Sequence, residues 1–495
     1  MKKPTTVFIL SAILMTMFLS CSDNIEKEPP DIKIPEGTTA AADTAVPEYI
    51  SPDTKYDGAE FVVAAVDYVS SGTSGKWAAT GYCEAFAAEQ NGDPLNDSIY
   101  LRNHTVEEAL EVDLTVYSLS SFANAADDFK KTVLAADDVI DYALINASNL
   151  PSLLGTDMLT DLYSLDMGFS RSYWDQNSVG ELELFGTLYA ATGDISLYSA
   201  YAPITYFFNK NLSEEYALGD LYDMVRGGSW TLDVAFEMSR KVAKDLNGNG
   251  KTDIDDSFGM LFESASLVYM VRSGGVRLTQ KDSEGIPQIT VNTERTSKLV
   301  ELCVPFLNDK ATNILAGNYT GYDNAFTDLM LPMFIDNRAL FYNNQMLVAL
   351  NLRNMNADFG VLPPPKYDAN QESYYCPVSD WWATFVVVPV TNGNHEMTSH
   401  VVDATAYYSQ QLVRPAYIDT TVLNKTLRDE DSVEMVELIF ANRVYDLGSF
   451  YNWGNINGMF TGLASGNNTN FTSAFASVET KIRTEIDKTI AALMK

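Results

Sequence analysis

Tryptophan residues stand beside carboxylate and amide side chains at three separate places in this sequence. The aromatic and acidic members of these clusters are Trp174, Asp175, Asp380, Trp381, Trp382, Tyr451 and Trp453. An aromatic plane can stack on the C–H face of a sugar ring, and carboxylates and amides can hydrogen-bond to its hydroxyl groups. This combination of residue types predicts a site for a carbohydrate or a similar polar ligand, with these residues as candidate contacts.

The tryptophans differ in how well they fit this interpretation. Trp77 lies in a Gly- and Ser-rich segment after the first expected strand, where ligand-contacting loops fall, and is a further candidate contact. Trp381 and Trp382 are neighbours on an expected strand, so their side chains point to opposite faces and only one is expected to reach a ligand. Trp230 stands close to Gly227 and Gly228 at a helix start, and a core position is favoured for it.

Residues 245–256 space oxygen-bearing groups as calcium-binding loops do. The candidate ligands are Asp245, Asn247, Asn249, Lys251, Asp253 and Asp256, with Lys251 contributing its backbone carbonyl. Gly250 stands where such loops turn sharply. Thr252 and Asp256 depart from the usual apolar residue and the usual glutamate. The segment therefore has two interpretations, a structural Ca²⁺ site or a polar turn held by its own Asx hydrogen bonds.

Sequence patterns typical of catalysis do not occur. The histidines His104, His395 and His400 lack metal-ligand spacing, and there is no GxSxG motif. A glycosidase needs two carboxylates, but among 66 acidic residues any pair can be drawn, so a pair near Asp175 and Asp380 carries little weight. We expect no enzyme and no catalytic cofactor. The alternatives are a surface glycoside-processing enzyme and a calcium-dependent adhesion or docking module.

The charge balance argues against two classes of partner. With 33 basic and 66 acidic residues the formal net charge is −33. Such a surface repels nucleic-acid phosphates and anionic membrane faces, so neither is an expected partner.

The cysteines Cys83, Cys303 and Cys376 form no CxxC pair. Two interpretations therefore stay open for them, one disulfide or three buried thiols.

The N-terminus has the features of a lipoprotein export signal. Lys2 and Lys3 precede an apolar run, residues 7–19, that is too short for a membrane span, and Ser20-Cys21 follows it. We expect residues 1–21 to be the signal, with Cys21 lipidated. The proline-rich residues 22–57 are expected to form a disordered tether. The protein would then lie on the extracytoplasmic face of the cell membrane, held by its lipid only.

Strand and helix patterns alternate through the rest of the chain. Strands are expected at 61–66, 114–117, 139–145 and 204–208, and helices at 122–133 and 231–244, with a further helix opening at a Thr105 capping box. The last third reads as helices at 401–411, 432–442 and 474–494. This alternation predicts an α/β fold with mostly parallel sheets.

Several short stretches, ordered along the chain, carry a resemblance to a known family. They are 92–97 (GDPLND), 172–177 (SYWDQN), 204–210 (ITYFFNK), 228–233 (GSWTLD), 245–259, 358–366 (DFGVLPPPK) and 428–432 (RDEDS). Their set covers most of residues 58–450. With these stretches the chain resembles the extracellular solute-binding proteins of bacterial carbohydrate ABC importers.

The resemblance implies a fold and a function. It implies a two-lobed, class II periplasmic-binding-protein-like α/β fold, with the ligand cleft between lobes joined by hinge strands. The first lobe would comprise 58–202 and 338–388, the second 206–335 and 392–495, and 199–209 would be the first crossing. A monomer would capture a sugar or oligosaccharide and deliver it to the permease subunits of an ABC transporter.

The anchoring prediction is tested by substituting the cysteine. Cys21→Ala removes the site of lipid attachment, so the variant is expected in the soluble fraction with unchanged ligand affinity. Immunoblotting of membrane and soluble fractions after a high-salt wash measures this. A variant that remains in the washed membrane would show that another feature holds the protein there.

Overall fold

The structure, a computed structural model, describes residues 52–67, 83–136, 138–352, 355–421 and 430–494. These residues belong to the second of two units of the chain, residues 48–495. The expected signal at 1–21 with Cys21, most of the expected tether at 22–57, and Trp77 lie outside the described residues. No helix within the described ranges is long and apolar enough to cross a membrane.

The first sheet has four strands in the order β12-β3-β1-β2. Its strands are β1 (Ala59–Val66), β2 (Val112–Leu119), β3 (Tyr142–Asn146) and β12 (Thr384–Val387). β1 pairs in parallel with β2 and β3, and β12 pairs antiparallel with β3. The strands expected near 61–66, 114–117 and 139–145 are thus present, and all five residues of β3 are buried.

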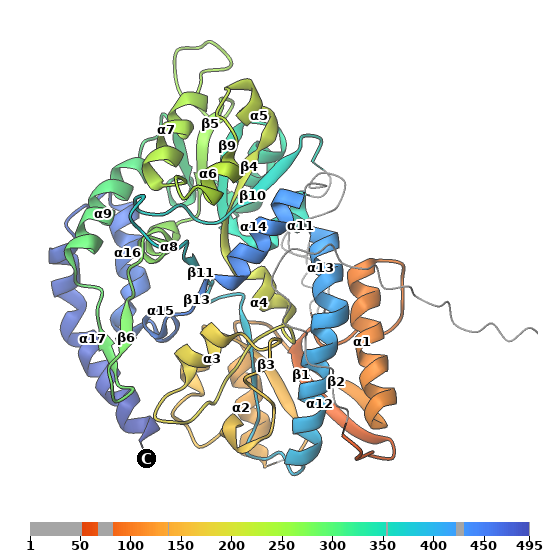
Figure 1. Cartoon of the computed structure of the whole chain (residues 1–495). Coiled ribbons are helices and arrows are strands. Elements are labelled where there is room, and N and C mark those ends of the chain that lie inside the picture. The colour runs from red at the N-terminus through yellow and green to blue at the C-terminus, as the bar shows by residue number, and fades with distance from the viewer. Residues whose placement is uncertain (1–51, 68–82, 137, 353–354, 422–429, 495) are drawn as a thin grey trace, which may run out of the picture. The chain divides into compact units, whose positions relative to one another are not determined.

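Three helices cover this sheet. They are α1 (Pro94–Leu110), α2 (Ala125–Ala135) and α12 (His395–Tyr408). Helix α2 contacts β1, β2 and β3, whereas α12 packs on α1 (Figure 1). The expected helix start at Thr105 is wrong, because α1 begins at Pro94. Asp93 caps it by accepting hydrogen bonds from the Leu95 and Asn96 amides, and Thr105 lies inside it.

The second sheet has five strands in the order β10-β4-β9-β5-β8. They are β4 (Ile204–Asn209), β5 (Phe258–Phe262), β8 (Asn313–Leu315), β9 (Ala339–Gln345) and β10 (Phe359–Leu362). β5 is parallel to β8 and β9, and β4 is antiparallel to β9 and β10. The first sheet is therefore mostly parallel, as the sequence suggested, with β12 as its antiparallel strand, whereas the second sheet is mixed.

Helices α7 (Leu232–Val242), α8 (Ser266–Ser273) and α9 (Glu294–Leu307) belong to the second sheet's part of the chain. Helix α7 packs on β5. Gly259 permits this packing, since a Cβ there would lie 2.3 Å from the Ser239 carbonyl oxygen. We refer below to the first sheet with α1, α2 and α12 as the first body, and to the second sheet with α7–α9 as the second body.

Two segments have different partners from those expected for the lobes. Strands β9 and β10 fall within 338–388, which was expected in the first lobe, but both pair in the second sheet. Helix α12 falls within 392–495, expected in the second lobe, but packs on α1 of the first body. The cause is non-local pairing: β4 binds β9 and β10 across more than a hundred residues. The lobe boundaries as a whole stay a prediction.

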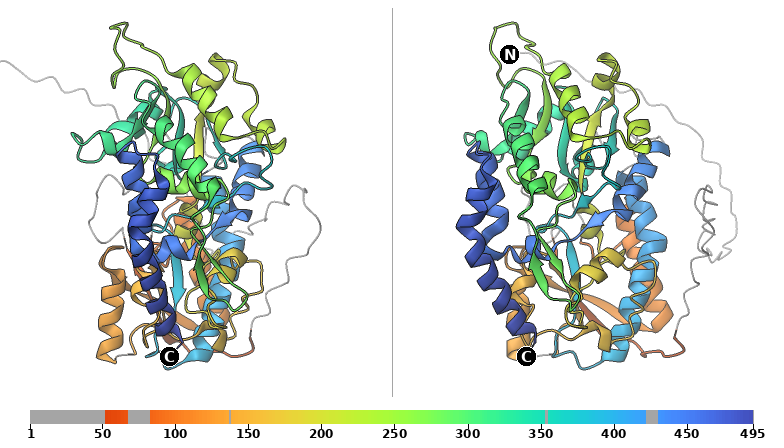
Figure 2. Two further views of the ribbon diagram at one scale, coloured as in Figure 1. Left: turned by 90° about the vertical axis from the view of Figure 1, so that its left-hand side faces the viewer. Right: turned by 60° about the vertical axis from the view of Figure 1, so that its left-hand side comes forward.

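The C-terminal helices continue from α12 towards the second body. They are α13 (Arg414–Thr421), α14 (Glu430–Ala441), α15 (Leu447–Tyr451), α16 (Ile456–Ser465) and α17 (Phe471–Leu493). Helix α13 packs on α1, α14 contacts β10, and α16 packs on α8. Helix α17 contacts α16 and α9 and forms the long dark-blue helix in Figure 2.

Cys83, Cys303 and Cys376 are free and buried. Of the two interpretations that the sequence left open, they are therefore thiols.

The chain crosses between the sheets where the site is expected. Helix α4 (Leu197–Tyr201) packs on β12 and is followed directly by β4. Because β12 is antiparallel to β3, it begins at the carboxyl edge of the first sheet. Because β4 is antiparallel to β9, it begins at the carboxyl edge of the second. The carboxyl edges of both sheets therefore meet at this crossing, the usual place for ligands in open α/β sheets.

Candidate ligand-binding site at the junction of the two sheets

The loop before β12 lies at the junction and is fixed to both sides of it. The Ser148 amide donates to the Asp380 carbonyl at 2.7 Å, and the Asn146 side-chain amide donates to the Trp381 carbonyl at 3.1 Å. The Ser379 amide donates to the Ala202 carbonyl, next to the start of β4. Asp380 and Trp381 are thus held at the carboxyl end of β3, beside the crossing.

Asp380 is a largely buried carboxylate with polar neighbours from the C-terminal helices. The Asn457 side-chain amide donates to Asp380 Oδ2 at 3.1 Å. Burial raises the pKa of Asp380 above its ordinary value, and the nearby Arg272 guanidinium opposes this shift. Arg272 itself is fully buried and donates to the Val444 carbonyl at 2.9 Å and to the Ser449 hydroxyl. A carboxylate held in this way is a defined acceptor for ligand hydroxyls.

Glu263 is a second carboxylate at the same edge. It follows β5 directly, and its Oε1 accepts a hydrogen bond from the Asn344 side-chain amide at 3.1 Å. Burial raises the pKa of Glu263 to about 7, and the Asn344 bond opposes the shift. Tyr269 of α8 joins the two carboxylates. Burial raises the pKa of Tyr269, and the Asp380 and Glu263 charges add to that shift.

Trp381 and Trp382 have different surroundings. Trp381 is 45% exposed, whereas Trp382 is 7% exposed. The Trp382 ring lies edge-on to Phe122, with centroids 5.5 Å apart, and stacks on Tyr198 at an interplanar angle of 21°. Trp382 is therefore a core residue here. The accessible aromatic plane beside Asp380 is that of Trp381.

Trp174 and Asp175 are engaged within the fold. Trp174 is 1% exposed and its indole N–H donates to the Met167 carbonyl at 2.9 Å. Asp175 caps α3 (Gln176–Leu182), forms an ion pair with Arg443 at 2.7 Å, and accepts a hydrogen bond from the Tyr445 hydroxyl at 2.8 Å. Both residues line a cavity of about 300 Å³ with Arg414 and Phe440, in which Gln176, Asn177 and Glu437 are exposed. The expected solvent-facing plane of Trp174 is not seen.

Tyr451 and Trp453 form a stacked pair near the junction. Their ring centroids are 4.6 Å apart at an interplanar angle of 13°. Trp453 is 3% exposed and its indole N–H donates to the Thr489 hydroxyl of α17 at 3.0 Å, so its burial differs from the expected exposed plane. The Tyr451 hydroxyl is buried and has no hydrogen-bond partner among the described residues. Buried hydroxyls are normally paired, so this one is available to a ligand or to water.

Helix α8 also has two buried polar atoms without a hydrogen-bond partner among the described residues. They are the Ser266 hydroxyl and Arg272 Nε. Sequence reasoning missed Ser266, Tyr269 and Arg272, because α8 reads as an apolar helix, and it also missed Glu263 before that helix. One signal could have found Glu263, since it is the first polar residue after a fully buried strand and ligands bind outside the carboxyl ends of such strands.

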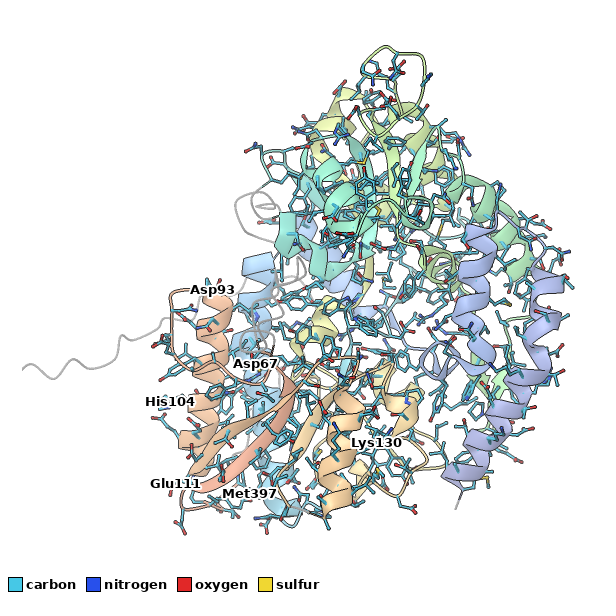
Figure 3. The ribbon with its side chains drawn as sticks, turned by 180° about the vertical axis from the view of Figure 1, so that it is seen from behind. Asp67, Asp93, His104, Glu111, Lys130 and Met397 are labelled. Atoms are coloured by element: carbon cyan, nitrogen blue, oxygen red, sulfur yellow. The ribbon has the colours of Figure 1, made fainter. Side chains whose placement is uncertain are left out.

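A larger cavity of about 480 Å³ lies between β2 and the start of α1. Its lining includes Ile99, Leu114, Val116 and Ser118, and it ends at Asp67 and Cys83. Figure 3 labels Asp67 at the end of β1. Asp67 and Cys83 flank residues 68–82, which lie outside the described structure together with the candidate Trp77.

The 245–256 loop is closed by its own side chains. The Asp245 carboxylate accepts from the Gly248 and Gly250 amides at 2.7 and 2.8 Å, and the Asp256 carboxylate accepts from the Leu246 and Asp253 amides. Asn249 donates to Asp253 at 2.7 Å. Within the described ranges no group of three or more His, Cys, Asp or Glu is placed to hold a metal ion. A Ca²⁺ ion bound by Asp245, Asn247, Asn249, Lys251, Asp253 and Asp256 stays a prediction.

Comparisons with known proteins agree on the fold. No family model matches the sequence. No curated protein matches it either. A cyclo/maltodextrin-binding protein complexed with maltotetraose is 12% identical, with a TM-score of 0.58 over 87% of this chain and 98% of that one. An ABC substrate-binding protein from Listeria monocytogenes, in complex with cycloalternan, is 12% identical, with a TM-score of 0.57 over 88% and 100%.

A third similar structure is the GacH receptor of Streptomyces glaucescens, solved unliganded and with acarbose. It is 11% identical, with a TM-score of 0.55 over 86% of this chain and 97% of that one. The chain therefore has the two-lobed α/β fold of substrate-binding proteins, as the sequence predicted. At this identity the likeness concerns the fold, and the residues of the site have to be judged by their own geometry.

The raised pKa of Glu263 predicts how stability depends on pH. The carboxyl has a pKa of about 7 in the fold and 4.5 as a free group, so the fold disfavours its ionised form. The wild type should therefore lose stability as pH rises from about 4.5 to above 7, at about 1.4 kcal/mol for each pKa unit of difference. Glu263→Gln removes this loss and should raise the melting temperature at pH 8 but not at pH 4. Glu237→Gln, at an exposed position, is the control, and equal effects of both variants would contradict the assignment.

The calcium prediction is tested by chelation. If Ca²⁺ binds the loop, EDTA lowers the melting temperature and added Ca²⁺ restores it, because ligand binding to the native state stabilises that state. Asp245→Ala should abolish the response to both. Calorimetric titration of the metal-stripped protein with Ca²⁺ gives the second measurement. An unchanged melting curve together with no heat of binding would identify the loop as a polar turn.

Proposed function

We propose that the protein is the substrate-binding component of an ABC importer, which captures a sugar or oligosaccharide and delivers it to permease subunits in the membrane. The observation that carries this proposal is the accessible Trp381 plane beside the Asp380 carboxylate, where the carboxyl edges of both sheets meet. Glu263 follows β5 at the carboxyl edge of the second sheet. The three similar structures support it, because they hold maltotetraose, cycloalternan or acarbose.

The chemistry of the site suits a neutral, hydroxyl-rich ligand. Trp381 offers a plane for a ring face, while Asp380 and Glu263 offer acceptors for hydroxyl groups. The unpartnered Ser266 and Tyr451 hydroxyls can donate or accept. The buried Arg272 guanidinium already lies near the Asp446 and Asp380 carboxylates, so its positive charge is balanced and the site disfavours anionic ligands such as sugar phosphates.

The proposed role is binding without turnover. A glycosidase would need two carboxylates free to act as acid and nucleophile or base. Asp175, one member of the pair that the sequence could offer, already caps α3 and bonds to Arg443 and Tyr445. That engagement supports a binding protein over the alternative of a glycoside-processing enzyme. The proposal keeps the Cys21 lipid anchor on the extracytoplasmic face, the monomeric state and the permease partner as the sequence predicted them.

Titration calorimetry with maltotetraose and a panel of other neutral oligosaccharides tests the proposal. We expect at least one sugar to bind the wild type. Trp381→Ala should weaken that binding by about 1–3 kcal/mol, the range for loss of a stacking plane. Tyr117→Ala is the control, since Tyr117 is also exposed but lies on β2, the edge strand of the first sheet opposite β12.

Two results would overturn the proposal. One is a panel in which no sugar binds the folded wild type. The other is release of shorter sugars during incubation with the protein, which would show hydrolysis. Full affinity in a folded Trp381→Ala variant would remove Trp381 from the site.

A further inference from the structure

A short hairpin extends from the second body towards the first. It consists of β6 (Thr279–Lys281) and β7 (Pro287–Ile289), paired antiparallel, and lies in the chain between α8 and α9. In Figure 1 it runs beside α17, at the level of α3. Strand β6 contacts α15, and β7 contacts α17. The hairpin therefore belongs to the second body by sequence and packs along the C-terminal helices.

The base and the turn of the hairpin are both held rigidly. At the base, the buried Asp446 carboxylate accepts from the Leu278 amide at 2.7 Å and from the Thr279 hydroxyl at 3.3 Å. At the turn, Asp282 Oδ1 accepts from the Glu284 and Ile286 amides at 2.9 and 3.0 Å. The arm therefore presents the side chains at its middle in a fixed place.

Lys281, in the middle of the arm, contacts the first body. Its ammonium group donates to the Gly180 carbonyl and, at 2.8 Å, to the Glu183 carbonyl. These carbonyls lie at the C-terminal end of α3, which ends at Leu182. The last carbonyls of a helix lack intrahelical partners and carry the negative end of its dipole. The lysine supplies both the missing donor and the favourable charge.

Helix α3 is part of the first body. The segment that follows it reaches the first sheet, because the Leu162 amide donates to the Leu188 carbonyl and the Ala191 amide donates to the Val386 carbonyl of β12. A second contact crosses beside the hairpin, where Glu181 Oε1 of α3 accepts from the Leu447 amide of α15 at 3.0 Å. The Lys281 contact therefore joins two parts of the protein that carry opposite sides of the candidate site.

We propose that the β6–β7 hairpin is a latch between the two bodies, and that Lys281 is a positioning residue that stabilises their closed arrangement without touching the ligand. A ligand held between two bodies dissociates when they separate, so a contact that opposes separation lowers koff. The ligand part of this inference rests on the proposed function. The latch itself is a property of the ligand-free chain.

The test uses distance measurements between nitroxide labels on the full chain. Leu134→Cys in α2 and Lys310→Cys after α9 place exposed labels on the two bodies, while the three described native cysteines are buried. Lys281→Met removes the ammonium group and keeps the side chain's length. It should broaden the inter-label distance distribution towards longer distances. Lys281→Arg should restore the wild-type distribution, and Lys241→Met, at an exposed lysine of α7, should leave it unchanged.

A ligand measurement follows the distance measurement. For maltotetraose, or the panel sugar that the wild type binds, Lys281→Met should raise koff about three- to tenfold. An unchanged distance distribution in Lys281→Met overturns the latch, including the case where only the melting temperature falls. A wild type that binds no sugar contradicts the proposed function and leaves the distance result to decide the latch alone.

Discussion

The candidate site depends on the crossing in which α4 runs into β4 beside the start of β12. The Ser199 hydroxyl donates to the Thr384 carbonyl at 2.8 Å, and the Ser379 amide donates to the Ala202 carbonyl. Behind them lies Glu84, fully buried, which accepts from the Thr384 hydroxyl at 2.8 Å and from Ser196 at 3.1 Å. Burial raises the pKa of Glu84 to about 7, and these donors oppose the shift. A satisfied buried polar network specifies one arrangement of the segments that it joins, here the crossing and the loop with Asp380 and Trp381.

The sequence predicted helices and strands whose patterns lie within a short stretch of residues. It did not predict strand pairings, which depend on residues far apart in the chain. The apolar run Ile204–Asn209 forms β4, and the pattern near 231–244 forms α7. The start of α1 was misplaced because the capping box at Thr105 matched a general pattern, while the Asp93-Pro94 cap was decisive. The partners of β9 and β10 could not be inferred, since β10 and the first four residues of β9 lack charged side chains on either face and would suit either sheet.

The same limit applies to the tryptophans of the site. Trp174, Trp381 and Trp453 have similar polar neighbours in sequence, yet only Trp381 is accessible. Trp174 is covered by the chain at Gly193, where a Cβ would lie 2.1 Å from the Tyr173 carbonyl. Trp453 is covered by α17, which approaches so closely that a Cβ on Gly454 would meet Ile482 at 2.4 Å. Burial here is set by segments distant in sequence, so local composition predicts a carbohydrate-type cluster without showing which ring faces out.

The polar groups at the junction cost stability in the ligand-free fold. Glu263 has one amide donor, and the hydroxyls of Ser266 and Tyr451 have no partner among the described residues. Unsatisfied buried groups are costly, and they persist where a function requires them. A ligand that pairs with them recovers part of that cost only when both bodies enclose it, since Glu263 belongs to the second sheet and Trp381 to the loop before β12. Affinity in such a site depends on its own contacts and also on every contact that holds the bodies together. A lysine of β6 that binds the end of α3 can therefore act on a ligand that it never contacts.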